Sequence, residues 1–151
     1  MDLRIRRATS HDVPAIVALL ADDALGRQRE SAADHGRYEA AFEAIDSDPH
    51  QLLTVGELAG AVVATMQLTF IPGLSRRGAW RAQIEGVRVA STARGQQVGG
   101  QLVQWAVAQA RARGCALVQL TSDNRRPDAH RFYQRLGFVA SHTGFKLDLP
   151  A

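Results

Sequence analysis

Apolar residues follow two spacings along this chain, a period of two in short stretches and a helical period in longer ones. Residues 3–8 (LRIRRA) alternate apolar and basic positions, which predicts a strand with one buried face. Residues 12–23 carry apolar side chains at helical spacing, so a helix is expected there. Thr9 or Ser10 can cap this helix, and Pro14 is tolerated near its start.

A second helix and a hairpin are expected next. Residues 37–45 predict the helix, and the polar, arginine-containing segment 25–36 before it is expected to be the most flexible part of the fold. Two apolar runs, residues 51–57 and 59–71, are separated by a short turn, which indicates an antiparallel hairpin.

A further strand is expected at residues 81–90 (RAQIEGVRVA), after a loop that begins at Pro72 and Gly73 and contains two adjacent arginines. Gly86 inside this strand predicts a bulge, or a place where another group lies against the backbone. Alternation along the strand places four side chains on one face: Gln83, Glu85, Val87 and Val89.

The last third of the chain predicts two more helices and two more strands. One helix begins at residue 98 and ends at Gly114, and residues 116–122 follow as a strand. Residues 126–136 form the next helix, and residues 137–149 close as one more strand or hairpin. The late crossover helices imply a mixed sheet in the order β α α β β β α β α β.

Composition limits the class of protein. With 151 residues, 46% of them hydrophobic and 22% charged, the chain is expected to form one soluble domain over residues 1–151. The first ten residues lack the apolar core of a secretory signal, which favours a cytoplasmic location.

The net charge is +3, but the arginines are scattered, so neither a nucleic acid nor a membrane is expected as a partner. The lone Cys115 and the dispersed histidines predict no metal site.

Residues 94–100 (RGQQVGG) lie where a strand gives way to a helix. Glycine lets the backbone turn sharply, and a helix start offers unpaired N–H groups, so this corner suits an anion such as a phosphate. It is not a P-loop, because Gln101 follows Gly100 where lysine is needed, and Gly95 and Gly99 do not fit the dinucleotide spacing. A plain strand-to-helix turn is the simpler alternative.

Two segments resemble the GNAT superfamily of N-acetyltransferases. VRVASTARGQQVGGQLV is similar to its coenzyme A binding motif, and HRFYQRLGF is similar to the helix and strand that follow in that family. The sequence departs from the family pattern at Gln97, where the first glycine is usual. The resemblance implies an α/β (α+β) fold with a mixed, mostly antiparallel central sheet, flanked by helices and splayed between its fourth and fifth strands.

The resemblance also implies acetyl-CoA as co-substrate, with no metal, and assigns the cofactor contacts. The backbone of Val87, Arg88 and Val89 should pair with the pantetheine arm and the acetyl carbonyl. Asn124 and Arg126 are alternative candidates for one further contact with the cofactor, and it is left open whether either residue makes it. Main-chain N–H groups of eight consecutive residues should wrap the pyrophosphate: Arg94, Gly95, Gln96, Gln97, Val98, Gly99, Gly100 and Gln101.

Two residues are candidates for catalysis. Tyr133 matches the tyrosine that protonates the departing thiolate in many family members, and the alternative is an aromatic ring packed beside Phe132. An alkylamine is protonated at neutral pH, so a base is needed before it attacks the thioester. Glu85 is the candidate base, directly or through water, and the alternative is a solvated carboxylate paired with a neighbouring arginine such as Arg81.

Two functional classes follow from these residues. The leading one is an enzyme that moves an acetyl group to a primary amine of a small molecule or a protein by direct attack in a ternary complex. The alternative is a non-catalytic acyl-CoA-binding module of the same shape. Arg76, Arg77 and Arg81 border the acceptor pocket if they point inward and face water otherwise. A homodimer is left open beside a monomer.

Overall fold

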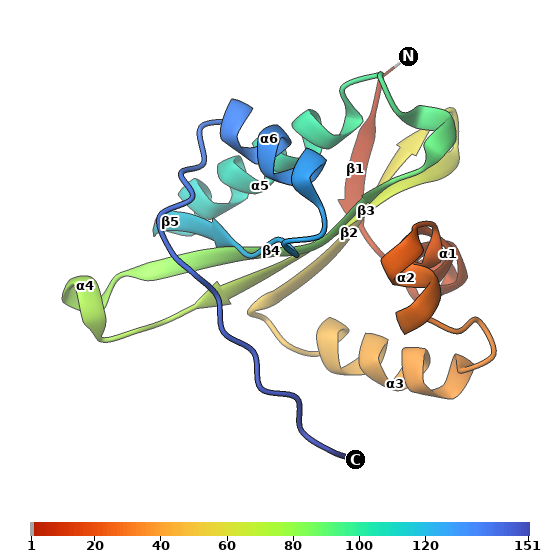
Figure 1. The fold of residues 1–151 in the computed structure, drawn as a ribbon, viewed down its shortest axis with the longest axis horizontal. Helices are drawn as coiled ribbons and strands as arrows, with labels where there is room; N and C mark the ends of the chain where they lie inside the picture. Colours follow the sequence, from red (N-terminus) through yellow and green to blue (C-terminus); the bar gives the residue numbers. More distant parts are fainter. Residues whose placement is uncertain (1) are drawn as a thin grey trace. The chain divides into compact units, whose positions relative to one another are not determined.

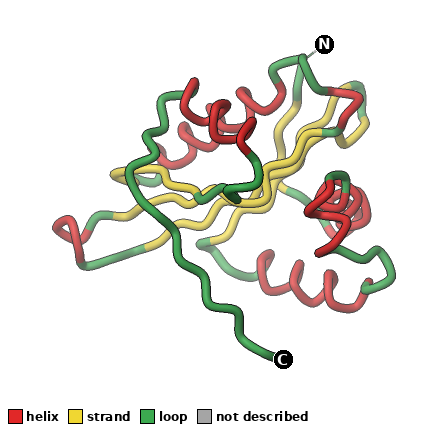
Figure 2. Tube along the Cα trace, viewed as in Figure 1, coloured by secondary structure: helices red, strands yellow, loops and turns green. Residues whose placement is uncertain are grey.

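The structure, a computed structural model, describes residues 2–151, which fall into two compact units, residues 2–119 and 120–151. Figure 1 labels the helices and strands, and Figure 2 distinguishes helix, strand and loop by colour. The elements before the boundary are β1 (Arg4–Arg7), α1 (Val13–Ala21), α2 (Ala24–Arg29), α3 (His35–Asp46), β2 (Gln51–Leu58), β3 (Ala61–Ile71), α4 (Ser75–Gly78), β4 (Trp80–Val89) and α5 (Val98–Ala112). The elements at and beyond it are β5 (Cys115–Leu120) and α6 (Pro127–Arg135). Within residues 2–151 no helix combines the length and apolar character needed to cross a bilayer.

The sheet has the order β1-β2-β3-β4-β5. Each of the first four strands pairs antiparallel with the next. The helix α5 carries the chain from β4 to β5, and these two strands run parallel. The sheet is therefore mixed and mostly antiparallel, as the sequence predicts, while the expected splay between β4 and β5 stays a prediction.

One face of the sheet packs against α5. Alternate positions of β3 and β4 supply buried side chains to this face: Ala64, Met66, Leu68, Phe70, Ala82 and Ile84. The apolar stripe of α5 meets them with Leu102, Val103, Ala106 and Ala110. Arg113, just after α5, places its guanidinium 4.0 Å from the ring centroid of Phe70. Each fully buried large side chain contributes about 1.5–3 kcal/mol, so this layer is the main source of stability.

The opposite face is covered near β1 and β2 by α1 and α3. Ile16 of α1, Val55 of β2 and Ala8 form a buried cluster there. Partly buried side chains pack around it: Leu20, Phe42, Leu53 and Val62. The predicted helices at residues 12–23 and 37–45 are thus confirmed as α1 and α3.

Two connections contain more helix than the sequence predicts. Part of segment 25–36, expected to be flexible, is the helix α2, whose start is capped by Asp23: its Oδ1 accepts the N–H of Gly26 at 2.5 Å. The loop after β3 contains the four-residue turn α4, in which Arg76 and Arg77 adopt left-handed backbone conformations. Both helices are short, six and four residues, and so carry no apolar period that sequence analysis could detect.

Residues 137–149, predicted as a final strand or hairpin, contain no strand in the structure. The chain leaves α6 at Gly137, which has φ 96, and continues as an extended tail. A strand needs a neighbouring backbone to complete its hydrogen-bond ladder, and residues 120–151 supply none. The prediction of a final strand or hairpin is therefore wrong.

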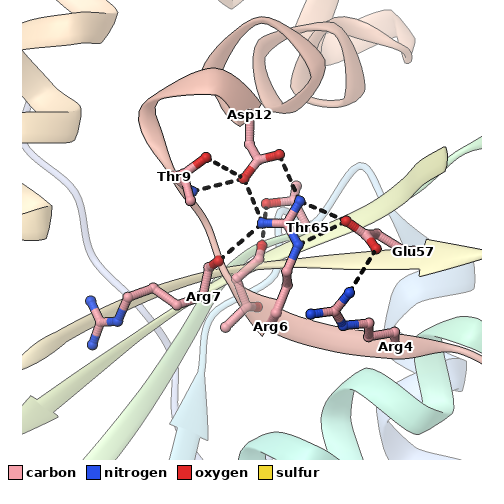
Figure 3. A network of polar contacts seen from close by, with 8 residues as sticks. Arg4, Arg6, Arg7, Thr9, Asp12, Glu57 and Thr65 are labelled. Carbon is pink, nitrogen blue, oxygen red and sulfur yellow. Dashed lines mark hydrogen bonds and ion pairs between the residues drawn. The ribbon is translucent and has the colours of Figure 1, made fainter. Parts of the chain in front are cut away.

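Arg6 joins three elements through two carboxylates (Figure 3). Its Nη1 and Nη2 donate to the two oxygens of Asp12 at 2.7 and 2.9 Å, and its Nε donates to Oε1 of Glu57 at 2.7 Å. Asp12 also accepts the backbone N–H of Thr9 at 2.7 Å. The cluster therefore ties β1 to the start of α1 and to the end of β2.

Asp12 is the buried member of this cluster, with a side chain only 9% exposed. The hydrogen bonds from Arg6 lower the pKa of Asp12 from 3.8 to about 2, although burial acts in the other direction. The same hydrogen bonds raise the pKa of Arg6. Both groups are therefore charged at neutral pH.

The lowered pKa of Asp12 predicts an acid-sensitive contribution to stability. A carboxyl group whose pKa falls from 3.8 to about 2 on folding stabilises the protein by about 2 kcal/mol at neutral pH. This contribution is present above pH 4 and is lost as the pH falls from about 4 to 2, because the unfolded chain binds the proton first. Asp12→Asn should lower the free energy of unfolding by about this amount at pH 7 and flatten its loss over that pH range, measured by urea denaturation. Asp22→Asn, which removes an exposed carboxylate near the end of α1, is the matched control; equal losses in both variants would contradict the prediction.

Candidate functional site

A bulge at Gly86 interrupts the pairing of β4 with β3. Gln67 of β3 pairs with Glu85 and Thr65 pairs with Arg88, so three steps along β4 match two along β3. Gly86 has φ 64, a left-handed conformation that glycine adopts without a Cβ clash. The predicted bulge is therefore confirmed.

The bulge changes which side chains share a face. Arg88 lies on the same face as Glu85, whereas Val89 lies on the α5 face with Ile84. The prediction that Gln83, Glu85, Val87 and Val89 share one face is therefore wrong for Val89. The physical reason is that one inserted residue inverts the alternation of every residue after it.

Arg88 joins the end of β4 to the start of α2. Its Nη1 donates to the carbonyl oxygen of Val87 at 2.8 Å, and its Nε lies 3.7 Å from Oδ2 of Asp23. The other carboxylate oxygen of Asp23 caps α2. The segment Val87–Val89, predicted to face the thioester arm, is thus held beside a helix that the sequence did not reveal.

The connection from β4 to α5 makes two left-handed turns. After a 3₁₀ turn at Ser91–Ala93, Gly95 adopts φ 80 and Gln97 adopts φ 61 and ψ 20. Val98, which is 2% exposed, anchors the first turn of α5 in the core. Arg94 is exposed at the start of this loop, where its guanidinium can reach an anion.

The first N–H groups of α5 have no acceptor within the helix. The first helical bond runs from the N–H of Gln101 to the oxygen of Gln97 at 3.1 Å, which leaves the N–H groups of residues 98–100 at the helix start. A Cβ built on Gly95 or Gly100 would meet no atom within 4 Å, so the fold leaves open space at both glycines. Unpaired N–H groups at the positive end of a helix suit an anion such as a diphosphate.

Glu85 is exposed on the sheet face opposite α5. Its Oε1 lies 3.4 Å from the hydroxyl oxygen of Thr69, whose single proton can be donated to Glu85 or to Gln51. In the part of the chain that the structure describes, no ion pair joins Glu85 to Arg81. The structure therefore does not support the alternative in which this carboxylate is neutralised by Arg81.

Polar side chains from four strands form a row on the same face. The Oε1 of Gln51 accepts bonds from Gln67 at 2.9 Å and from Thr69 at 3.0 Å. Further along, Gln119 of β5 donates to Gln83 of β4 at 3.0 Å. This polar row crosses β2, β3, β4 and β5 and suits a small polar ligand. Sequence analysis missed it, although the alternation of these residues with core residues was an available signal.

The three arginines considered for the acceptor differ in their surroundings. Arg76 and Arg77 are exposed in the turn α4, with φ values of 55 and 61. Arg81 is half-buried on the face of the polar row, and its buried Nε has no hydrogen-bond partner among residues 2–151. Of the three, only Arg81 shares a face with Glu85.

The second unit holds the other predicted site residues. The half-buried ring of Tyr133 makes edge-on contacts with Phe132 and Phe138, at centroid distances of 5.0 and 5.7 Å. Asn124 is exposed in the turn before α6, and Arg126 is the N-cap residue of that helix. The roles of Tyr133, Asn124 and Arg126 toward the cofactor stay predictions.

Comparisons with known proteins agree on one family. Residues 14–138 match the family model described as Acetyltransferase (GNAT) family. The aminoalkylphosphonate N-acetyltransferase of Salmonella typhimurium is 31% identical over 145 residues, which are 93% of this chain and 88% of that protein. A structure from Bacillus halodurans, described as a transcriptional regulator, is 48% identical with a TM-score of 0.94 and covers 98% of this chain and 100% of its own. A putative acetyltransferase from Agrobacterium tumefaciens is 29% identical with a TM-score of 0.82, over 97% of this chain and 99% of its own.

The left-handed conformation of Gln97 predicts a stabilising substitution. A side chain at φ 61 is strained by about 1–2 kcal/mol, and glycine removes that strain while losing about 0.5–1 kcal/mol to the entropy of the unfolded chain. Gln97→Gly should therefore raise the free energy of unfolding by about 0.5–1 kcal/mol, measured by urea denaturation. Gln97→Ala keeps the strain and serves as control. A less stable glycine variant would show that the side chain of Gln97 makes a compensating contact.

Proposed function

Since this chain belongs to the GNAT acetyltransferase family, whose members are acetyl-CoA-dependent N-acetyltransferases, we propose that it acetylates a primary amine of a small molecule by direct attack in a ternary complex. The observation that carries this proposal is the start of α5, with its unpaired N–H groups, beside a strand that bulges at Gly86. Both features lie in the first unit and need no contact with the second.

The diphosphate of acetyl-CoA is proposed to bind residues 94–101. The N–H groups of residues 98–100 lie at the positive end of α5, and the exposed Arg94 adds a full positive charge. Gln97 offers its backbone N–H in place of the glycine that is usual in the family, and its left-handed φ gives it the conformation that a glycine adopts readily. The side chain of Gln97 is therefore no obstacle to the backbone geometry.

The chemistry is proposed to run on β4. The amine loses a proton to Glu85, directly or through water, and its nitrogen then attacks the thioester carbonyl carbon. As the C–N bond forms and the C–S bond breaks, a backbone N–H of Val87–Val89 stabilises the oxyanion. The departing thiolate takes a proton from the hydroxyl of Tyr133, and the new amide nitrogen loses its second proton to water, from which that hydroxyl is restored. Exposure of Glu85 beside the Thr69 hydroxyl supports a role through water.

A small acceptor is favoured over a protein. The polar row offers amide and hydroxyl groups within one sheet face, a surface suited to a compact polar molecule. The Salmonella relative is named for aminoalkylphosphonates, so short aminoalkyl compounds with and without an acidic group are the first acceptors to test. The unpartnered Nε of Arg81 on this face supports an acceptor with an acidic group.

One observation favours the non-catalytic alternative. The Bacillus halodurans structure is described as a transcriptional regulator, which is a statement about that protein and not about transfer chemistry. A regulator that senses acyl-CoA would bind the cofactor and release no thiol with any amine. Measurement of free thiol release with an amine panel therefore separates the two functions.

Cofactor binding should depend on Arg94. Loss of a charge-assisted contact to a phosphate is worth about 1.5–3 kcal/mol, so Arg94→Ala should weaken acetyl-CoA binding by about 10- to 100-fold in calorimetry. Arg111→Ala removes another exposed arginine, from the last turn of α5, and should leave the affinity unchanged. Equal affinity in the wild type and in Arg94→Ala would contradict the proposed phosphate site.

Turnover should depend on Tyr133 more than cofactor binding does. Removal of a proton donor slows a transfer step by about 100-fold or more, so Tyr133→Phe should lower kcat by this factor, measured by thiol release, with little change in acetyl-CoA affinity. Tyr38→Phe alters the other tyrosine of the chain, whose hydroxyl bonds Glu30, and serves as control. An unchanged kcat in Tyr133→Phe would assign the proton to another donor.

A further inference from the structure

We infer that Arg81 selects the acceptor by binding an acidic group at the far end of the molecule from its amine. This role rests on the proposed function, in which Glu85 takes the proton of the amine. The substrate class is therefore small molecules that carry an amine and an acidic group together, and Arg81 is the residue that distinguishes them from neutral amines.

Arg81 has a half-buried side chain whose charge the fold does not neutralise. Its buried Nε has no hydrogen-bond partner among residues 2–151, and no carboxylate in that range forms an ion pair with its guanidinium. A buried N–H group without an acceptor costs free energy, and a ligand oxygen placed against it recovers that cost. The guanidinium of Arg81 is therefore prepared to bind an acceptor atom from outside the fold.

The strands on both sides of β4 offer Arg81 no carboxylate. Ile71 stands opposite Arg81 in β3, and Gln83 is the next residue of β4 on the same face. The sequences of β3 (AVVATMQLTFI) and β5 (CALVQL) contain no charged residue. Among the groups that a small molecule can bring to this face, an acidic one forms the strongest hydrogen bonds with a guanidinium.

Arg81 and Glu85 place opposite charges at two points of the polar row. They lie four residues apart in β4, about 13 Å along the strand, which leaves room for several carbon atoms between the two groups that they bind. Gln83 lies between them and accepts a hydrogen bond from Gln119. A molecule with its amine at Glu85 and its acidic group at Arg81 matches both charges, whereas a diamine would bring a positive charge against Arg81.

The test compares 5-aminopentanoate with 5-aminopentanamide, which has the same carbon chain and a neutral end. The wild type should bind the acid about 10- to 100-fold more tightly, because only the acid forms a charge-assisted bond with Arg81, measured by NMR titration at the side-chain amide of Gln83. Arg81→Gln removes the charge but keeps a polar side chain, and it should make the two affinities equal. Thiol release should show the same preference in kcat/KM, and the same loss of it in Arg81→Gln.

Arg76→Gln is the matched control, because it removes the same charge from the exposed turn just before β4. This variant should keep the preference for the acid. A preference lost equally in Arg76→Gln and Arg81→Gln would assign it to the long-range field of the arginines and overturn the role of Arg81. Equal affinity of the wild type for the two probes, or a preference that survives in Arg81→Gln, would also overturn it.

The Nε–H resonance of Arg81 in the wild type gives a second measurement if Arg81→Gln does not fold. This resonance should shift on addition of the acid and stay unchanged with the amide, and an unchanged resonance with both probes would overturn the role of Arg81. Failure of the proposed acetyl transfer has a different signature, the absence of thiol release with either probe, and the NMR titration still decides whether Arg81 binds the acid.

Discussion

The extra residue at Gly86 determines what β4 presents to its two sides. Before the bulge, Ile84 faces the α5 core and Glu85 faces the polar row; after it, Arg88 and Val89 take the opposite sides from those that simple alternation gives. Arg88 consequently forms an ion pair with Asp23, which links the start of α2 to the strand that is proposed to hold the thioester. One glycine thus brings together a carboxylate, an arginine and the start of a helix.

The start of α5 is the second constraint, because it follows from the same short connection. Gly95 and Gln97 both adopt left-handed conformations, which turn the chain within a few residues from the end of β4 into the helix. Val98 then fixes the helix in the core, so its first N–H groups are held in place before a ligand arrives. Such preorganisation reduces the entropy lost on binding an anion.

The sequence predicted the elements in which an apolar pattern is repeated over many residues, and it also predicted the features marked by glycine. The helix at 98–112, the hairpin of β2 and β3 and the bulge at Gly86 were all recognisable for this reason. The helix α2 was missed because six residues are too few to show a period, and the capping role of Asp23 was not considered. The face of Val89 was predicted wrongly because the bulge was recognised at Gly86 but its inversion of the alternation in the later residues of the strand was not taken into account. The polar row requires knowledge of strand register, which joins residues as far apart as Gln51, Gln83 and Gln119.

Apart from Val98, which belongs to both, the candidate site and the stability of the fold rest on different residues. The proposed site uses local conformations that oppose ordinary preference: a bulged strand, a glutamine at positive φ and helix N–H groups without acceptors. Of these, the strain at Gln97 lowers stability and persists only where surrounding structure compensates. The compensation lies in the α5 core, and at the opposite edge of the sheet in Arg6, whose hydrogen bonds to Asp12 and Glu57 join β1, α1 and β2. This separation allows Gln97 to differ from the usual glycine without loss of the fold, because the strain at one loop residue is small beside the stability that the core and the Arg6 cluster supply.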